Sequence, residues 1–294
     1  MSGPGVRDDT GAFVAVPERV SRVVSLVPSL TETVAETAPG LVSGATDWCT
    51  HPAGLDVPRV RGTKNPDLAA VIALRPDLVL ANEEENRPAD LAALREAGLP
   101  VWVTVVRTLD EALVSLRLVL TVACRLPAPR WLEAAERVWQ VFPPDVPGRR
   151  QAVIPIWRRP WMVLGRDTFA GDVLARLGVA NLYAGHAERY PKIPLDDLLA
   201  AAPELVVLPD EPYRFTAGDG PGCFPGLPAA LVSGRHLTWY GPSLAEAPQI
   251  LAAQLAAAAP FSDDPGPRQL RPDSQGAELA WPGGRPGGLP RPGR

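Results

Sequence analysis

Several features are scarce in this chain of 294 residues, and each scarcity narrows the class of protein. Nowhere do about twenty apolar residues run without interruption, which argues against a membrane span. The formal charge is −4 at pH 7 and the Lys and Arg clusters are short, so the sequence predicts no nucleic-acid partner. Cysteine is rare, and Cys49, Cys124 and Cys223 lie far apart, which favours reduced thiols over a disulfide framework or a zinc ribbon.

The opening segment "MSGPGVRDDTGAFVAVPERV" lacks an apolar run of seven or more residues behind a positive start. It also has no nearby cysteine for a lipid anchor. This is not the pattern of a secretory signal. We therefore expect a soluble protein in the cytoplasm, with residues 1–20 as a flexible N-terminus.

The composition is that of a globular protein with ample material for a core. Hydrophobic residues make up 46% of the chain and charged residues 21%, and the length allows one large or two medium domains. Residues 261–294 differ, because Pro, Gly and Arg dominate and little apolar surface is available to offset the entropy of ordering. We expect this tail to be disordered.

Strand-like and helical patterns alternate in residues 21–107 and again in 150–260, which predicts parallel sheets flanked by helices. The capping-box spacing from Ser29 to Glu32 predicts the start of the first helix. Between the two regions, residues 108–143 carry apolar positions at helical spacing and predict a helical linker. The strands that we expect are "RVVSLV", "LVSGAT", Leu78 to Ala81, "PVWVTV", "AVIPIW" and "LVVLP".

A short unit recurs in the two regions. "ALRPDLVLANEEEN" and "AAAPELVVLPDEPY" align when Pro76 is placed on Pro203, which places Asp77 on Glu204. Glu83 and Glu84 then fall on Asp210 and Glu211. We infer two related lobes, although helix, proline, acid and strand also recur by chance in α/β proteins.

The chain resembles the periplasmic-binding-protein-like proteins with a helical backbone, the group that receives vitamin B12, ferric siderophores or metals. The motifs that carry the resemblance are "VVSLVPSLTETV", "GTKNPDLAAVIALRPDLVLANEEEN", "LGRDTFAGDVLARLGVANLY", "YPKIPLDDLLAAAPELVVLP" and "LTWYGPSLAEA". The resemblance implies an α/β fold of two Rossmann-like lobes joined by a helical backbone, with a ligand cleft between the lobes.

The resemblance also places "NEEEN" and "PDEPY" opposite each other, since open α/β sheets bind ligands at the carboxyl ends of their strands. Three adjacent carboxylates are tolerated beside a wet cleft but not in a core. Rings on cleft loops supply the apolar area that a flat ligand needs. The predicted ligand-binding residues are Trp48, Glu84, Asn86, Trp157, Tyr190, Tyr213, Trp239 and Tyr240.

A metal site is a weaker hypothesis. His51 is the predicted metal ligand, and Cys49, His186 and a carboxylate such as Glu84 are the residues that would complete a transition-metal site. The spacing also suits purely structural roles, and we expect no required cofactor.

A membrane permease partner is doubtful by the same resemblance. Exported receptors of this type tend to carry one docking glutamate on each lobe, and here the first position holds Ala69 while the second keeps an acid, Asp196. The loss of a charge pair weakens docking and orientation. We therefore expect a small-molecule or metal-chelate ligand, no membrane insertion and a doubtful ABC permease partner.

The sequence favours a non-catalytic solute-binding protein over an enzyme. The expected ligand is a corrinoid (cobalamin), a haem-like molecule or a ferric chelate. The sequence contains no Gly-x-Ser-x-Gly motif and no phosphate-binding glycine loop. The alternatives are an interaction module of the same fold that has lost its ligand, and a metal-dependent enzyme.

Overall fold

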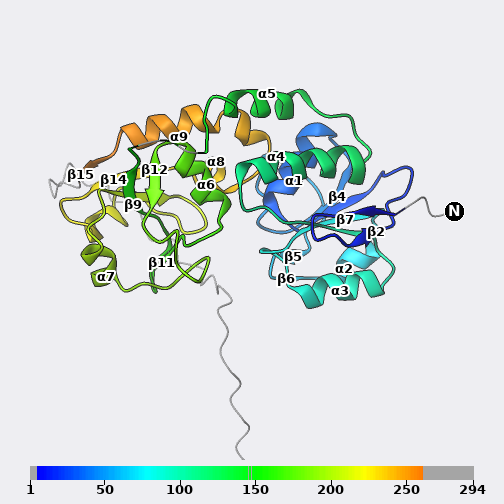
Figure 1. Ribbon diagram of the computed structural model, residues 1–294. Coiled ribbons are helices and arrows are strands. Elements are labelled where there is room, and N and C mark those ends of the chain that lie inside the picture. The colour runs from blue at the N-terminus through cyan, green and yellow to red at the C-terminus, as the bar shows by residue number, and fades with distance from the viewer. Residues whose placement is uncertain (1–4, 145, 147, 261–294) are drawn as a thin grey trace, which may run out of the picture. The chain divides into compact units, whose positions relative to one another are not determined.

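The computed structural model describes residues 5–144, 146 and 148–260. Within these ranges one sheet has four strands and another has five, and three further ribbons have two strands each (Figure 1). The predicted tail lies outside the described residues. None of the described helices combines the length and hydrophobicity that a bilayer crossing needs.

The first lobe is built on a parallel sheet of order β4-β3-β7-β8. Helices make the crossovers, as parallel strands require. The strands are β3 (Val23–Ser25), β4 (Val42–Ala45), β7 (Leu78–Asn82) and β8 (Val101–Thr104). The helices are α1 (Pro28–Thr37), α2 (Leu68–Ala73) and α3 (Pro88–Glu96), and a small ribbon is made by β5 (Arg61–Gly62) and β6 (Asn65–Pro66).

Strand β7 is buried along both faces, which explains its unbroken apolar sequence. Leu78 and Leu80 point into the core cluster that contains α1, and Val79 and Ala81 point into the cluster that contains α2 and α3. This alternation follows from the two-residue period of a strand.

The second lobe repeats the plan, with the order β12-β9-β13-β14-β15 and only β15 antiparallel. Its helices again cover both faces of the sheet (Figure 1). The strands are β9 (Arg150–Val153), β12 (Val179–Asn181), β13 (Leu205–Pro209), β14 (Pro228–Val232) and β15 (Ala259–Pro260), with a side ribbon of β10 (Pro155–Trp157) and β11 (Met162–Val163). The helices are α6 (Phe169–Arg176), α7 (Leu195–Ala200), α8 (Gly234–Thr238) and α9 (Ala247–Ala256), with short helical turns η2 (Pro221–Cys223) and η3 (Pro242–Ala245).

Equivalent residues of the predicted repeat perform the same task in both lobes. The amide of Asp77 donates to the carbonyl of Arg22 at 2.8 Å, and the amide of Glu204 donates to that of Gln151 at the same 2.8 Å. Each carboxylate accepts the amide of that same partner in return, at 2.9 Å and 2.7 Å. The repeat is therefore structural and not a coincidence of composition.

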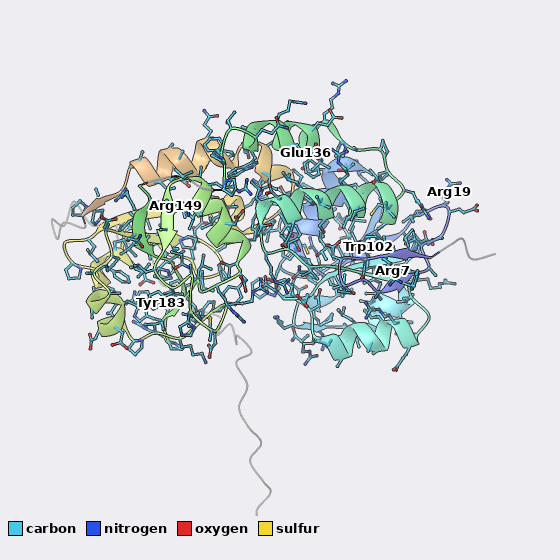
Figure 2. The ribbon with its side chains drawn as sticks, in the orientation of Figure 1. Arg7, Arg19, Trp102, Glu136, Arg149 and Tyr183 are labelled. Atoms are coloured by element: carbon cyan, nitrogen blue, oxygen red, sulfur yellow. The ribbon has the colours of Figure 1, made fainter. Side chains whose placement is uncertain are left out.

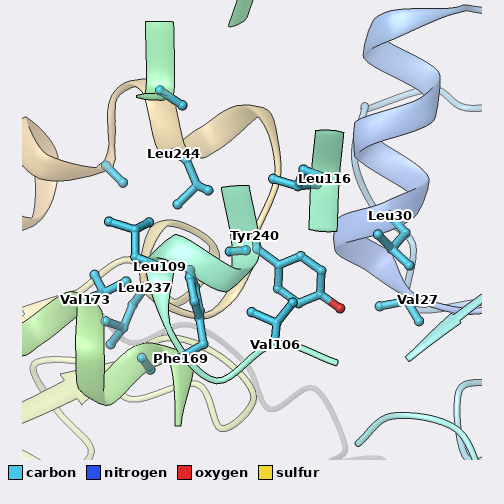
Figure 3. Packing of buried hydrophobic residues seen from close by; sticks show 14 of the residues in the cluster. Val27, Leu30, Val106, Leu109, Leu116, Phe169, Val173, Leu237, Tyr240 and Leu244 are labelled. Carbon is cyan, nitrogen blue, oxygen red and sulfur yellow. The ribbon is translucent and has the colours of Figure 1, made fainter. Parts of the chain in front are cut away.

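The lobes are joined through α4 (Leu109–Leu118), a π-helical turn η1 (Val119–Ala123) and α5 (Arg130–Trp139), as the helical-linker prediction stated. One core cluster runs through this junction and includes Leu30 of the first lobe, Leu116 of the linker and Val173 of the second lobe (Figure 3). The indole of Trp139 also donates to the carbonyl of Leu244 at 2.9 Å. Continuous apolar packing of this kind resists large movements of one lobe against the other.

The predicted start of the first helix differs from the structure. Helix α1 begins after Val27, with no side-chain cap, and Ser29 is already the second helical residue, so the capping box predicted from Ser29 and Glu32 is wrong. The capping box occurs at α4, where Thr108 and Glu111 satisfy each other's amides. Pro28 explains the difference, because proline is pre-organised for the first helical position, and the cap therefore falls on Val27, two residues before Ser29.

The opening segment was expected to be flexible, but its described part forms a hairpin of β1 (Val6–Arg7) and β2 (Phe13–Val14). Asp8 is 5% exposed, and its Oδ2 accepts the amide of Val103 in the edge strand β8 at 3.1 Å. Figure 2 labels Arg7 of this hairpin near Trp102 of β8. Two aspartates thus replace the neighbour that an edge strand lacks, since Asp9 accepts the amide of Val105 at 3.1 Å.

Candidate ligand site between the lobes

The three adjacent glutamates lie on a tight turn at the carboxyl end of β7. The side-chain oxygen of Asn82 accepts the amides of Glu84 and Glu85 at 2.9 and 3.2 Å. Asn86 closes the turn, because its Oδ1 accepts the amide of Asn82 at 2.9 Å. The two asparagines satisfy the backbone, which leaves the glutamate side chains free to take separate directions.

Those directions explain how three carboxylates coexist. Glu83 is exposed and lies 3.3 Å from the guanidinium of Arg107. Glu85 turns toward Thr63 and Lys64 of the same lobe, and burial raises the pKa of its carboxyl. Glu84 crosses to the second lobe.

Glu84 meets two donors there. Its Oε1 lies 2.6 Å from Nη1 of Arg189, and it accepts the hydroxyl of Tyr190 at 3.0 Å. Lys64 of the first lobe donates to the main-chain oxygen of Glu84. Burial raises the pKa of the Glu84 carboxyl although Arg189 acts to lower it, and burial likewise raises the pKa of Tyr190, with Glu84 adding to the effect.

The guanidinium of Arg189 is held by its own lobe. Its Nε and Nη2 donate to the carbonyl of Asp167 at 3.0 and 2.6 Å, which leaves Nη1 directed at Glu84. The amide of Gly165 donates to the carbonyl of Arg189 at 2.7 Å. A Cβ at Gly165 would collide with the carbonyl of Glu188, so this close approach of two chain segments requires glycine.

Tyr240 forms a second, deeper link between the lobes. Its hydroxyl accepts Nδ2 of Asn82 at 2.8 Å and lies 3.0 Å from Oγ1 of Thr104, and its ring packs edge-on against Phe169 (Figure 3). The side chain is 7% exposed, and burial raises its pKa. The structure therefore makes Tyr240 an anchor of the lobe junction, which corrects its prediction as a ligand contact.

His51 and Trp239 make a third contact across the boundary. Their rings meet edge-on at 5.4 Å, and the indole of Trp239 is hydrogen-bonded to Glu211. Burial raises the pKa of the Glu211 carboxyl, and the nearby Asp210 adds to the effect. Glu84 and Glu211, aligned by the repeat, thus both end as desolvated carboxyls at the carboxyl ends of equivalent strands.

A cluster of rings lies at the same end of the second lobe. Trp157 packs edge-on against Tyr213 at 5.6 Å, and Tyr213 lies 4.7 Å from Phe215, which in turn stacks on Trp161 at 6.0 Å. The hydroxyl of Tyr213 donates to Asp219 at 2.5 Å. The structure brings the two predicted residues Trp157 and Tyr213 together, and it adds Trp161 and Phe215, which the prediction of site residues did not include.

Trp48 and Asn86, the last two predicted ligand residues, differ in their exposure. Trp48 is 45% exposed on the loop after β4, where it is available for contact. Asn86 is 2% exposed, and its amide nitrogen donates to the carbonyls of Leu26 and Thr63 at 3.3 and 2.9 Å. With its oxygen bonded to Asn82, Asn86 has a structural role, which corrects its prediction as a ligand contact.

Among the described residues, no group of three or more His, Cys, Asp or Glu side chains is arranged to hold a metal ion. Nδ1 of His51 lies 3.1 Å from the hydroxyl of Thr50. Cys49 is buried beside the hydroxyls of Thr31 and Thr46, and burial raises the pKa of its thiol. The predicted companions of His51 are thus not gathered around it.

A cavity of about 560 Å³ lies at the helical linker. Leu113, Trp139, Phe142 and Arg176 are among its lining residues. None of the predicted ligand residues lines this cavity.

The prediction missed Arg189 and Lys64, which both contact Glu84. A signal for Arg189 was present, because it directly precedes Tyr190 in "ERYPKIP" and supplies the cation that a desolvated carboxylate needs. Lys64 lies in the turn between β5 and β6, remote in sequence from the glutamates, and only the fold brings it to them.

A family model described as periplasmic binding protein matches residues 23–211. The chain belongs to the periplasmic binding protein family. The match begins at β3 and ends just beyond β13, so it includes Glu84, Arg189 and Tyr190 as well as the linker. The family assignment confirms the resemblance that the motifs indicated.

Curated relatives within the family are vitamin B12-binding proteins. The protein from Vibrio cholerae is 24% identical over 214 residues, which is 67% of this chain and 73% of the relative. The protein from Pectobacterium carotovorum is 24% identical over 269 residues, covering 85% and 93% of the two chains.

Solved structures confirm the fold of a two-lobed periplasmic binding protein. The vitamin B12 binding protein BtuF of Vibrio cholerae superimposes with a TM-score of 0.66 at 16% identity, covering 82% of this chain and 98% of that one. The heme-binding protein RhuT from Roseiflexus sp. RS-1 gives 0.65 at 20% identity over 80% and 98%. Helicobacter pylori CeuE with bound Ni(II) gives 0.73 at 14% identity over 86% and 89%.

The prediction of a cytoplasmic location is wrong. The family is that of periplasmic binding proteins, and the BtuF and RhuT structures are described as periplasmic. The prediction was based on the composition of residues 1–20, whereas the similarity to periplasmic proteins is carried by the folded lobes.

Proposed function

We propose that this protein binds a corrinoid, a haem-like molecule or a ferric chelate between its lobes, without catalysing a reaction. The observation that carries the proposal is that rings gather at the carboxyl ends of the second lobe's strands, while Arg189 of that lobe meets Glu84 of the first. Trp157, Tyr213 and Trp161 offer ring surface, and Arg189 offers a fixed cation. A flat ligand is held by apolar area and oriented by a few polar groups, which fits this set.

The relatives support the ligand class. Curated relatives are named for vitamin B12 binding, and structural neighbours are described as binding vitamin B12, heme or Ni(II). Binding needs only complementary surface, and the continuous core at the linker holds that surface largely preformed.

Ligand entry requires the loops to part, since Glu84 touches Arg189 and Tyr190, and His51 touches Trp239. These contacts also favour a second candidate, an interaction module of the same fold that keeps its lobes closed. A small opening at the loops, with the Tyr240 anchor retained, reconciles the contacts with ligand binding.

We expect docking to a membrane permease to be weak. Ala69 is exposed on α2 where the resemblance leads us to expect an acid, while Asp196 is exposed in the first turn of α7. One docking acid in place of two gives less charge complementarity.

The test is a titration of the purified protein with haemin, cyanocobalamin and a ferric catecholate, followed by tryptophan emission and the visible spectrum. We expect one stoichiometric coloured complex, weakened at least tenfold by Trp157→Ala or Trp48→Ala, because an anchoring ring contributes about 1–2 kcal/mol or more. Phe13→Ala is the matched control, since Phe13 is a 67% exposed ring on the N-terminal hairpin. If none of the three compounds binds, the interaction module is favoured.

A further inference from the structure

Arg189 and Tyr190 have the arrangement of an oxyanion-binding pair. A guanidinium nitrogen and a phenolic hydroxyl converge on one oxygen, at 2.6 and 3.0 Å. The guanidinium is already oriented by the carbonyl of Asp167, so little side-chain entropy remains to be lost on binding an anion. An ion pair and a phenolic hydrogen bond on the same oxygen together give an acidic ligand group a strong anchor.

The present occupant of this pair is the protein's own carboxylate. Glu84 arrives from the other lobe on a turn that the side chains of Asn82 and Asn86 hold in shape. Burial raises the pKa of Glu84 despite the neighbouring cation, so the carboxylate is held there at a desolvation cost. Any other anion that binds this pair must therefore displace Glu84.

We propose that Arg189 and Tyr190 are the subsite for an oxyanion of the ligand, and that Glu84 is an internal competitor which that group displaces. The inference depends on the proposed function for the ligand's place between the lobes. It reverses the expected role of Glu84, from a ligand contact to a group that keeps the subsite filled while no ligand is bound.

The exchange leaves neither donor of the pair without an acceptor. The incoming oxyanion takes over the two donors, and the Glu84 carboxylate returns to water, where its desolvation cost is recovered. Lys64 stays with the turn, because it donates to the main-chain oxygen of Glu84 and not to the carboxylate. The Tyr240 anchor need not break, since its partners Asn82 and Thr104 lie at the base of the turn and on the next strand.

The pH dependence of binding distinguishes displacement from contact. A displaced Glu84 returns to an ordinary pKa of about 4.3, so binding releases a proton and affinity falls as the pH falls between the two pKa values. A Glu84 that stayed beside the bound anion would have its pKa raised further, and affinity would then rise as the pH falls. The groups facing Glu84 are Arg189, Tyr190, Lys64 and Glu85. Of these, Glu85 is the other carboxyl that can change protonation in this pH range. The pH dependence of binding in the Glu84→Gln variant measures the contribution of Glu85, which is then subtracted.

The first experiment uses inorganic sulfate, whose charge is constant over this range, and follows the side-chain ¹⁵N signal of Arg189. In E84Q we expect sulfate to shift that signal at a concentration about tenfold lower than in the wild type, the equivalent of one charge-assisted contact. Glu83→Gln is the matched control in the same turn, and it should behave as the wild type because Glu83 pairs with Arg107. Equal responses in E84Q and the wild type, or an Arg189 signal that sulfate never moves, would overturn the inference.

The second experiment compares haemin with its dimethyl ester, which has the same macrocycle but no carboxylate. E84Q should tighten haemin about tenfold and leave the ester unchanged, while Arg189→Ala should remove the preference for haemin over the ester. Weaker haemin binding in E84Q, or equal changes for the two compounds, would contradict displacement. Failure of every chelate to bind would refute the proposed function, yet the sulfate experiment would still decide the inference.

Discussion

Oε1 of Glu84, at the end of β7, lies 2.6 Å from Nη1 of Arg189 in the opposite lobe. Together with the Tyr240 anchor and the contact of His51 with Trp239, this ion pair makes the loops of the two lobes touch. The lobes are also joined by a continuous apolar core at the linker. The loops are thus the part of the boundary held by a few polar and ring contacts, and they are where opening is least costly.

Tyr240→Phe tests the buried anchor. Removal of the hydroxyl leaves Nδ2 of Asn82 without one acceptor in a buried site, and we expect a loss of about 1–2 kcal/mol in the free energy of unfolding. Tyr183→Phe is the control, because that side chain is only half-buried, and it should change stability less. Urea unfolding measures the stability of both variants. A loss in Tyr240→Phe no larger than that in Tyr183→Phe would contradict the anchoring role of the Tyr240 hydroxyl.

Gly165→Ala tests the close approach that positions Arg189. The new methyl group would meet main-chain atoms of Glu188 and Arg189, which cannot move aside, and we expect a loss of about 1–3 kcal/mol in stability. Gly185→Ala is the matched control, since nothing lies within 4 Å of its Cβ position. Thermal unfolding compares the two, and a neutral Gly165→Ala would mean that the segments separate without cost.

Asp8→Ala tests the hairpin as the cover of edge strand β8. The Asp8 carboxylate accepts the amides of Thr10, Ala12 and Val103, and its removal leaves the buried amide of Val103 without this acceptor, which should cost about 1–3 kcal/mol. Glu18→Ala is an exposed control from the same opening segment and should be nearly neutral. Faster amide exchange at Val103 in Asp8→Ala is the second expected result, and unchanged exchange there would contradict the capping role.

Asp77 gives a pH dependence with a definite sign. Burial acts to raise the pKa of its carboxyl, but hydrogen bonds from Ser21 and Arg22 outweigh burial and the pKa is lowered. A lowered folded pKa stabilises the protein above the ordinary value of about 3.9, and the contribution is lost as the pH falls toward the folded value. Unfolding followed from pH 5 downward, at about half-unit steps, should show a shallower fall in stability for Asp77→Asn than for the wild type. The same slope in both would remove the assigned role.

The repeat was predictable from sequence because it is written in local chemistry. In each lobe a proline follows a helix, and the carboxylate of the next residue accepts an amide at the first strand of the sheet. The two acids are Asp77 and Glu204. The pairing extends further than the alignment indicated, since Arg75 and Ala202, each just before the proline, both have positive φ, at 44° and 48°. Trp157 and Tyr213 were each predicted as ligand residues, and the structure brings their rings together.

What the sequence did not predict depends on contacts between distant segments. Glu32 looked like half of a capping box, but the fold pairs it with Arg235 of the second lobe. Asn86 looked like a polar cleft residue, yet its bonds to Leu26 and Thr63 bury it. Residues 1–20 were expected to be flexible, and the free edge of β8 explains why Asp8 and Asp9 are held in place. No local pattern carries that information.

Amide hydrogen exchange, with and without saturating haemin, cyanocobalamin or ferric catecholate, is the most direct test of a site between the lobes. For the compound that binds, we expect altered exchange in residues 82–86 and 188–191 together, because one ligand contacts loops of both lobes. Unchanged exchange in both loops, or changes confined to the cavity lined by Leu113 and Trp139, would contradict the account.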